Sequence, residues 1–238
     1  MLVVYYKPLE KGLTMNKPNT FTVWNGNSEY TGNPISVFIT MKSSNIKTGD
    51  IPQITFTPNG VKPTDSLKNG RDKDVCGNCP LRPIHYKKHD HKKPCYVNLR
   101  CVNSIDRASN KPQYLFNNLF DVIRIGNWGD SASAKKEVIL EIVGQAKRVL
   151  NYTHGWAIDR VNYLKAFTMA SVHSVEEKIK ANKLGFRTFR TIPLACIKLE
   201  KDEIVCPNFV DQSIQCKQCK LCCGNQIKSN INIVIPSH

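Results

Sequence analysis

Seven of the ten cysteines in this chain fall into two groups, and their spacing is typical of metal or cluster ligands. The first group is Cys76, Cys79 and Cys95, and the second is Cys206, Cys216, Cys219 and Cys222. Two cysteines separated by two residues can point at one ion, because a tight turn brings both sulfurs to the same side. Bound metal is therefore the first hypothesis for this sequence.

A disulfide scaffold is the competing explanation for so many cysteines. We favour metal because the chain has 238 residues and begins with no expected secretion signal. The other three cysteines, Cys101, Cys196 and Cys223, also lack the regular spacing of a disulfide framework.

The two groups differ in the number of ligands that they offer. Three thiolates in the first group leave one coordination position open, as a catalytic metal or cluster requires. Zinc and an iron-sulfur cluster both remain possible there, since thiolates serve either, and so does coincidence. A structural zinc completed by Cys101 or by one of His85, His89 and His91 is a further alternative. The four cysteines of the second group can form a closed site, for which a structural role is favoured.

The charge of the chain favours a polyanionic partner. Thirty-four Lys and Arg against 19 Asp and Glu give a formal net charge of +15, and the excess gathers around the first cysteine group. The residues expected to contact nucleic acid are Lys87, Lys88, Lys92, Lys93, Arg187 and Arg190. One of the two arginines is equally well explained by an internal ion pair. No apolar stretch is long enough for a membrane span, so we expect a cytoplasmic protein without a membrane partner. The oligomeric state and the substrate are not indicated.

The chain divides into three expected parts. Residues 1–70 form a β-rich segment with runs at 21–24 and 35–40, and residues 71–205 form an α/β core that includes the basic cysteine loop. Residues 206–238 hold the second cysteine group and a last strand at 231–235.

The middle part alternates strands with helices. Strands are predicted at 121–125, 166–172, 186–192 and 204–205. One helix has its apolar face over 138–150, and another begins at a capping box formed by Ser174 and Glu177 and ends near Gly185. This order predicts a parallel sheet, open or curled into a partial or full (β/α) barrel. Chemistry in such folds lies at the carboxyl ends of the strands.

Other candidate residues follow the predicted strands. Gly126, Gly129 and Asp130 form a turn in which backbone amides approach a ligand, although Asp130 is also well explained as a helix cap. His154 and His173 are candidate acids, bases or metal ligands, or alternatively hydrogen-bonded structural residues.

These segments together resemble an uncharacterised protein family of tailed phages and mobile elements. The resemblance is carried by Cys-Gly-Asn-Cys-Pro, Arg-Ile-Gly-Asn-Trp-Gly-Asp, Tyr-Thr-His-Gly-Trp, Met-Ala-Ser-Val-His-Ser, Gly-Phe-Arg-Thr-Phe-Arg and the C-terminal Cys-x-x-Cys-x-x-Cys. More remotely, their order is similar to that of radical S-adenosylmethionine enzymes.

The remote resemblance implies a set of site residues. Cys76, Cys79 and Cys95 would bind a [4Fe-4S] cluster, and Gly126, Gly129, Asp130 and Ser171 would contact S-adenosylmethionine. The usual compact CxxxCxxC is replaced here by CxxC, 15 residues and one more cysteine. A barrel of the same shape that holds zinc in place of the cluster is therefore the alternative.

The sequence thus favours a phage-type metalloprotein that acts on nucleic acid or a nucleotide in the host cytoplasm. Asp130, His154 and His173 are its candidate catalytic residues. The alternative is a non-enzymatic, zinc-stabilised protein that binds nucleic acid or a host partner. A base-modifying transferase that uses Asp130 as nucleophile or base ranks third, because no partner carboxylate is identifiable.

Overall fold

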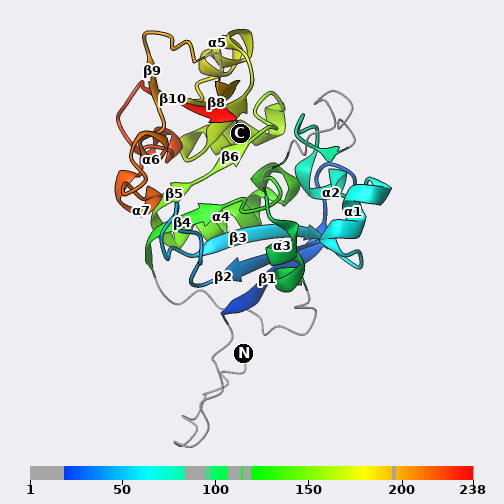
Figure 1. Cartoon of the computed structure of the whole chain (residues 1–238). Coiled ribbons are helices and arrows are strands. Elements are labelled where there is room, and N and C mark those ends of the chain that lie inside the picture. The colour runs from blue at the N-terminus through cyan, green and yellow to red at the C-terminus, as the bar shows by residue number, and fades with distance from the viewer. Residues whose placement is uncertain are drawn as a thin grey trace, which may run out of the picture.

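The protein has a mixed α/β fold with two five-stranded sheets, as the computed structural model in Figure 1 shows. The structure describes residues 19–83, 95, 97–106, 114, 119–194 and 197–237. All statements on contacts below refer to these residues.

The first sheet has the strand order β1-β2-β3-β4-β5. Its strands are β1 (Thr20–Asn27), β2 (Pro34–Thr40), β3 (Gln53–Pro58), β4 (Phe120–Ile125) and β5 (Ala146–Leu150). The first three pair antiparallel, whereas β3, β4 and β5 run parallel. Inward-facing Ile, Val and Phe side chains of β2, β3 and β4 are almost fully buried, which explains why these β-branched runs form strands.

The second sheet is parallel throughout and has the order β6-β7-β8-β10-β9. Its strands are β6 (Tyr152–Thr153), β7 (Met169–Val172), β8 (Thr188–Pro193), β9 (Glu203–Val205) and β10 (Asn232–Ser237). The last strand, β10, lies between β8 and β9.

Asn151 alone separates β5 of the first sheet from β6 of the second. Its buried side chain donates to the hydroxyl oxygens of Ser131 and Thr168, which fixes the junction between the sheets. The parallel strands therefore follow one another from β3 to β8 in sequence order, but the described strands do not close into a barrel.

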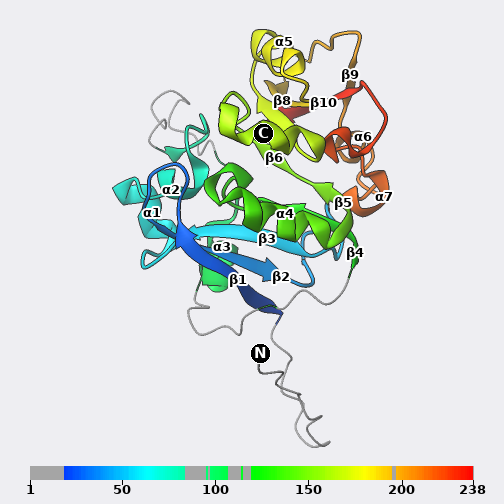
Figure 2. The same ribbon diagram turned by 180° about the vertical axis from the view of Figure 1, so that it is seen from behind.

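The helices lie around both sheets (Figures 1 and 2). They are α1 (Pro63–Asn69), α2 (Lys73–Cys76), α3 (Leu99–Asp106), α4 (Lys136–Gly144), α5 (Val175–Lys183), α6 (Pro207–Val210) and α7 (Cys216–Cys219). Helices α3 and α4 lie on opposite faces of the first sheet. Helix α2, which carries Cys76, and helix α7, which carries Cys216 and Cys219, lie on opposite sides of the molecule.

Most of the predicted elements are present. The runs at 21–24, 35–40, 121–125, 186–192, 204–205 and 231–235 lie in or overlap strands, and α5 begins at Ser174, whose hydroxyl accepts from the Glu177 amide. The capping box is modified, because the Glu177 carboxylate accepts from the His173 amide.

Two predicted elements were wrong in extent. The helix expected over 138–150 ends at Gly144, and Ala146–Leu150 forms β5 beside β4. A strand that follows a helix after one residue can continue its apolar periodicity by accident, so the pattern could not show the change. The strand expected from 166 begins only at Met169, because Asp159–Ala166 is a 3-10 helix.

The expected boundary at residue 70 falls inside one continuous sheet, since β3 pairs with β4. No helix within the described ranges has both the length and the apolar composition needed to cross a bilayer.

Candidate metal centres

The first CxxC turn begins where α2 ends. Cys76 is the last residue of α2, and the Cys79 amide donates to the Cys76 carbonyl, which folds the two cysteines into one tight turn. Gly77 has φ 56° and ψ −124°, a conformation that only glycine adopts readily. A Cβ at this position would also lie 2.6 Å from the Tyr30 ring, so Gly77 is required by both conformation and space.

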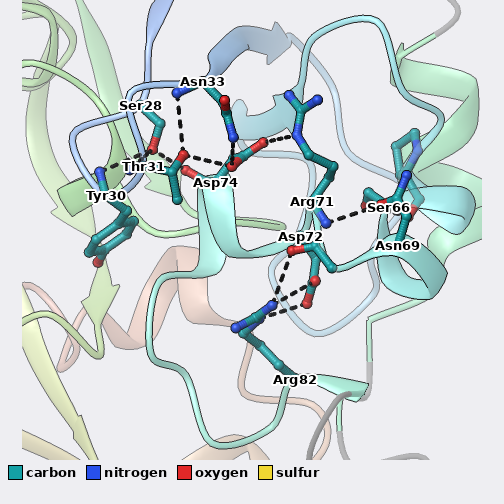
Figure 3. A network of polar contacts seen from close by, with 12 residues as sticks. Ser28, Tyr30, Thr31, Asn33, Ser66, Asn69, Arg71, Asp72, Asp74 and Arg82 are labelled. Atoms are coloured by element: carbon teal, nitrogen blue, oxygen red, sulfur yellow. Dashed lines mark hydrogen bonds and ion pairs between the residues drawn. The ribbon is translucent and has the colours of Figure 1, made fainter.

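A buried ion pair holds the CxxC turn in place (Figure 3). The Arg82 guanidinium donates to both carboxylate oxygens of Asp72, at 2.8 and 2.9 Å, and both side chains are buried. The same guanidinium donates to the Gly77 carbonyl at 3.3 Å. The turn therefore has a defined shape before any metal binds.

A second carboxylate ties α2 to the β1–β2 turn (Figure 3). Asp74 accepts hydrogen bonds from Thr31, Asn33 and Arg71. Burial alone would raise the pKa of Asp74, but these hydrogen bonds and the Arg71 charge lower it overall. Asp74 is therefore a structural anion.

Asp130 links the glycine turn after β4 to the cysteine turn and to His154. Its amide donates to the Val75 carbonyl at 2.7 Å. Its carboxylate accepts from the Ala132 amide, the Thr153 hydroxyl and the His154 amide, at 2.9, 2.7 and 2.7 Å. Asp130 also caps the 3-10 helix at Ser131–Ser133, as the alternative interpretation of this residue expects.

These contacts do not fit the binding of S-adenosylmethionine at this turn. The Asp130 side chain is buried and its oxygens are occupied by the protein itself. A Cβ at Gly129 would lie 2.7 Å from the Phe56 Cβ, and one at Gly126 would lie 3.0 Å from the Gly129 carbonyl oxygen, so internal packing explains both glycines. Ser171 is buried, and its carbonyl accepts from the Trp156 indole.

His154 and His173 meet beside the first cysteine turn. His154 follows β6, and His173 follows β7, so both lie at the carboxyl ends of neighbouring parallel strands. Their Nε2 atoms are 3.1 Å apart, and the Cys79 sulfur is 3.8 Å from the His154 Nε2. All three side chains are half-buried, so the cluster is accessible from solvent.

Burial controls the ionisation of this cluster. It raises the pKa of the Cys79 thiol to about 12, so Cys79 is not a thiolate nucleophile on its own. Burial and the neighbouring His173 lower the pKa of His154 to about 3, which leaves a neutral imidazole with one unprotonated nitrogen.

The remaining members of the first group are less completely placed. Burial raises the pKa of Cys76 first, and the negative charges of Cys79 and Cys95 raise it further, so the three sulfurs are electrostatically coupled. Cys101 is exposed on α3. The residues expected to complete the site or to bind nucleic acid from the loop, His85, His89, His91, Lys87, Lys88, Lys92 and Lys93, lie outside the described residues.

The second cysteine group lines a single small cavity. Cys206, Cys216, Cys219 and Cys222 surround a space of about 30 Å³, together with apolar side chains that include Phe189 and Ile233. All four are present as thiols. Cys206 follows β9, while the other three lie on and after α7, so two separate segments supply the sulfurs. The Cys216 amide donates to the Lys47 carbonyl, which docks α7 onto the first sheet's 45–50 loop.

Buried positive charge lies next to these four thiols. Arg124 is buried, its Nε has no hydrogen-bond partner in the described structure, and its charge lowers the pKa of Cys216 against the larger effect of burial. A buried, incompletely paired guanidinium is costly unless an anion lies nearby. Deprotonated, metal-bound thiolates would supply that anion.

The two arginines of the predicted phosphate-binding strand are internal, which corrects that expectation. Arg187 is buried and donates to the carbonyls of Leu221, Gly224 and Ile231, so it shapes the second cysteine segment. Arg190 is buried in an ion pair with Glu203, as the alternative interpretation expects. Neither guanidinium is available to a phosphate.

Within the described ranges, no group of three or more Cys, His, Asp or Glu side chains already has the spacing of a metal site. The structure does bring Cys79, His154 and His173 together, which the sequence did not predict. It also adds Thr191 and Glu177, which contact His173, and Arg124. No spacing rule could have identified them, because they come from different strands.

Comparisons of the chain with protein-family models, with curated proteins and with solved structures find no match. The function is therefore inferred from the geometry of the two cysteine groups.

Proposed function

We propose that this protein is a metalloprotein that acts on nucleic acid or a nucleotide. The first cysteine group is its reactive centre, and the second holds a structural metal through Cys206, Cys216, Cys219 and Cys222. Phage or mobile-element origin is part of the same proposal, through the resemblance of the sequence motifs.

One observation carries the proposal. The CxxC turn lies at the carboxyl ends of the parallel strands, with the Cys79 sulfur 3.8 Å from the His154 Nε2. Residues that reach this place come from α2, from the segment after β6 and from the segment after β7. In open parallel sheets and partial barrels this edge is where catalytic groups gather. Three half-buried donors at such an edge favour a metal that a substrate can reach.

The strand order also supports a partial barrel similar to that of radical enzymes. Parallel strands from β3 to β8 follow in sequence order, and the cysteine turn comes after the first of them. Because the Asp130 turn does not fit S-adenosylmethionine, we do not extend the proposal to that cofactor. A metal at this centre would supply a Lewis acid, while the protein positions the metal and shields it from bulk water.

A polar cavity near the centre suits a phosphate-bearing substrate. It measures about 350 Å³ and is lined by Lys135, Lys136, Arg160, Tyr163 and two glutamates. Tyr30 connects it with the cysteine turn, since the Arg160 guanidinium lies over the Tyr30 ring and that ring covers Gly77. With a net charge of +15, the chain would attract phosphate by counterion release.

A non-enzymatic, zinc-stabilised nucleic-acid-binding protein is the second candidate. Asp130 favours it, because this buried carboxylate is occupied by internal donors and cannot serve as the base of a reaction. In that case both cysteine groups would be structural.

Metal content and an ultraviolet-visible spectrum of anaerobically purified protein test the proposal. With iron and zinc supplied during expression, we expect metal at both sites, and Cys79→Ser should remove the first-site metal from a protein that stays folded. Less than one metal per chain in the wild type would overturn the proposal. Incubation with DNA, RNA and nucleotides separates the candidates, because a product mass formed by the wild type and not by Cys79→Ser requires an enzyme.

A further inference from the structure

We propose that Cys79, His154 and His173 share one divalent metal ion, so that the first site is a mixed thiolate-imidazole centre. This inference rests on the proposed metal at the first cysteine group, and it names ligands from outside that group.

The interatomic distances are close to those around one tetrahedral ion. Zinc lies about 2.0 Å from imidazole nitrogen and about 2.3 Å from sulfur, so tetrahedral ligands are about 3.4 Å apart for two nitrogens and about 3.6 Å for nitrogen and sulfur. The observed distances are 3.1 Å between the two Nε2 atoms and 3.8 Å from the His154 Nε2 to the Cys79 sulfur. Small side-chain rotations on binding would close the remaining edge, from Cys79 to His173.

The ring orientation agrees with a shared ion. The two imidazole planes differ by only 5°, and their centroids are 5.3 Å apart, so the Nε2 atoms lie between the rings. Two lone pairs that face one another in this way suit a cation between them.

The backbone and the side chain of each histidine are held by other residues. The His173 Nδ1 lies 2.5 Å from the Thr191 hydroxyl, and the His173 amide donates to the Glu177 carboxylate at 2.7 Å. The His154 amide donates to Asp130. Metal-binding histidines characteristically have the second ring nitrogen hydrogen-bonded, because that contact fixes the tautomer and the ring direction. Thr191 fulfils this role for His173.

The donor set selects the metal. Two imidazoles with thiolate suit a single zinc-type ion, whereas a [4Fe-4S] cluster takes thiolates. The fourth ligand would be one of the other thiolates of the group, Cys76 or Cys95, since both are electrostatically coupled to the same place. The first site is therefore a mononuclear centre.

A hydrogen bond between the two imidazoles would give similar distances, so the test must separate it from metal binding. We would titrate the metal-free full chain with Co²⁺ and record the absorption of the wild type, Cys79→Ser, His154→Ala and His173→Ala. The difference between the wild type and Cys79→Ser isolates the first site from the second. We expect each histidine variant to weaken Co²⁺ binding at the first site on the order of 100-fold and to shift its visible bands. His85→Ala and His89→Ala, in the same variant series, are the controls and should leave both unchanged.

Each outcome has a distinct meaning. If Cys79→Ser has the spectrum of the wild type, the first group holds no metal and the proposed function fails. If Cys79→Ser loses a site but both histidine variants keep wild-type affinity and bands, the mixed centre is wrong and the histidines form only a hydrogen-bonded pair. X-ray absorption of the zinc-loaded wild type needs no variant, and a shell of sulfur alone, without imidazole scattering at about 2.0 Å, would also overturn the inference.

Discussion

Arg190 and Glu203 join β8 to β9 through a buried ion pair. The Arg190 Nε donates to one Glu203 carboxylate oxygen at 2.7 Å, and its second nitrogen contacts the other oxygen. Burial raises the pKa of Glu203, but the Arg190 hydrogen bonds and charge outweigh it, so the pKa is lowered overall. Removing one partner leaves the other charge buried and unpaired.

Glu203→Gln should therefore lower the free energy of unfolding by about 3 to 5 kcal/mol at neutral pH. Because the folded-state pKa is lowered, this stabilisation is present above the unfolded pKa of about 4.3 and is lost as the pH falls through the folded value. Chemical denaturation between pH 7 and pH 3 would show the difference from the wild type shrinking with acidity. Glu141→Gln, at an exposed position on α4, is the control. A difference that is independent of pH would contradict this account.

At the residue scale, the sequence identified the cysteines but not their surroundings. CxxC spacing is a local property of the backbone, so the two turns could be predicted. Whether Asp130 or Arg187 faces a ligand or the interior depends on residues far away in the chain, such as Thr153 and Leu221, that a motif does not contain.

At the scale of elements, α7 is a single turn of helix that places two cysteines beside the cavity. It has four residues and ends at Lys220, a non-glycine residue with φ 55°. So short a helix has little stability of its own, and a left-handed residue adds strain. A metal bound by the four sulfurs would provide the missing stabilisation.

Cys219→Ser should consequently lower the melting temperature by 10 °C or more, on the order expected when a structural metal is lost. It should also remove the second-site metal and lower the yield of soluble protein. Cys101→Ser, at an exposed cysteine on α3, should change stability by less than about 0.5 kcal/mol. Differential scanning fluorimetry and metal analysis check both variants, and equal effects of the two would argue against a structural site at α7.

Most strands could be predicted because their β-branched runs lie between turn residues, as in β2 and β4. Strand β5 could not, since Ala146, Val149 and Leu150 continue the apolar periodicity of α4. Only pairing with β4, where Val149 lies beside Ile123, makes this segment a strand.

At the scale of the whole molecule, net charge remains the argument for a nucleic-acid partner. The loop lysines Lys87, Lys88, Lys92 and Lys93 lie between Cys79 and Cys95 in the sequence, so a metal at the first site would fix both ends of their loop. Their cations would then be presented near the proposed centre.

Replacing these four lysines by alanine should weaken DNA or RNA binding almost equally for all sequences. The slope of log affinity against log salt should flatten by up to about four times 0.9 for duplex DNA, because each lost phosphate contact removes about that much. The matched control replaces Lys180, Lys183, Lys198 and Lys201, which are exposed near α5 and β9 and remove the same total charge. Fluorescence anisotropy at several salt concentrations measures both. Equal slopes for the two variants would mean that the loop has no special role.

The position of β10 gives the assembly of the second centre a definite order. Strand β9 pairs with β10 and with no other described strand, and the Cys206 amide donates to the Val234 carbonyl. A ribosome makes all four cysteines of this group before it makes β10, yet Cys206 reaches its place only when β10 has inserted between β8 and β9. Metal capture at this centre would then be the last event of folding, so a nascent chain halted before residue 232 would carry its sulfurs without a finished site.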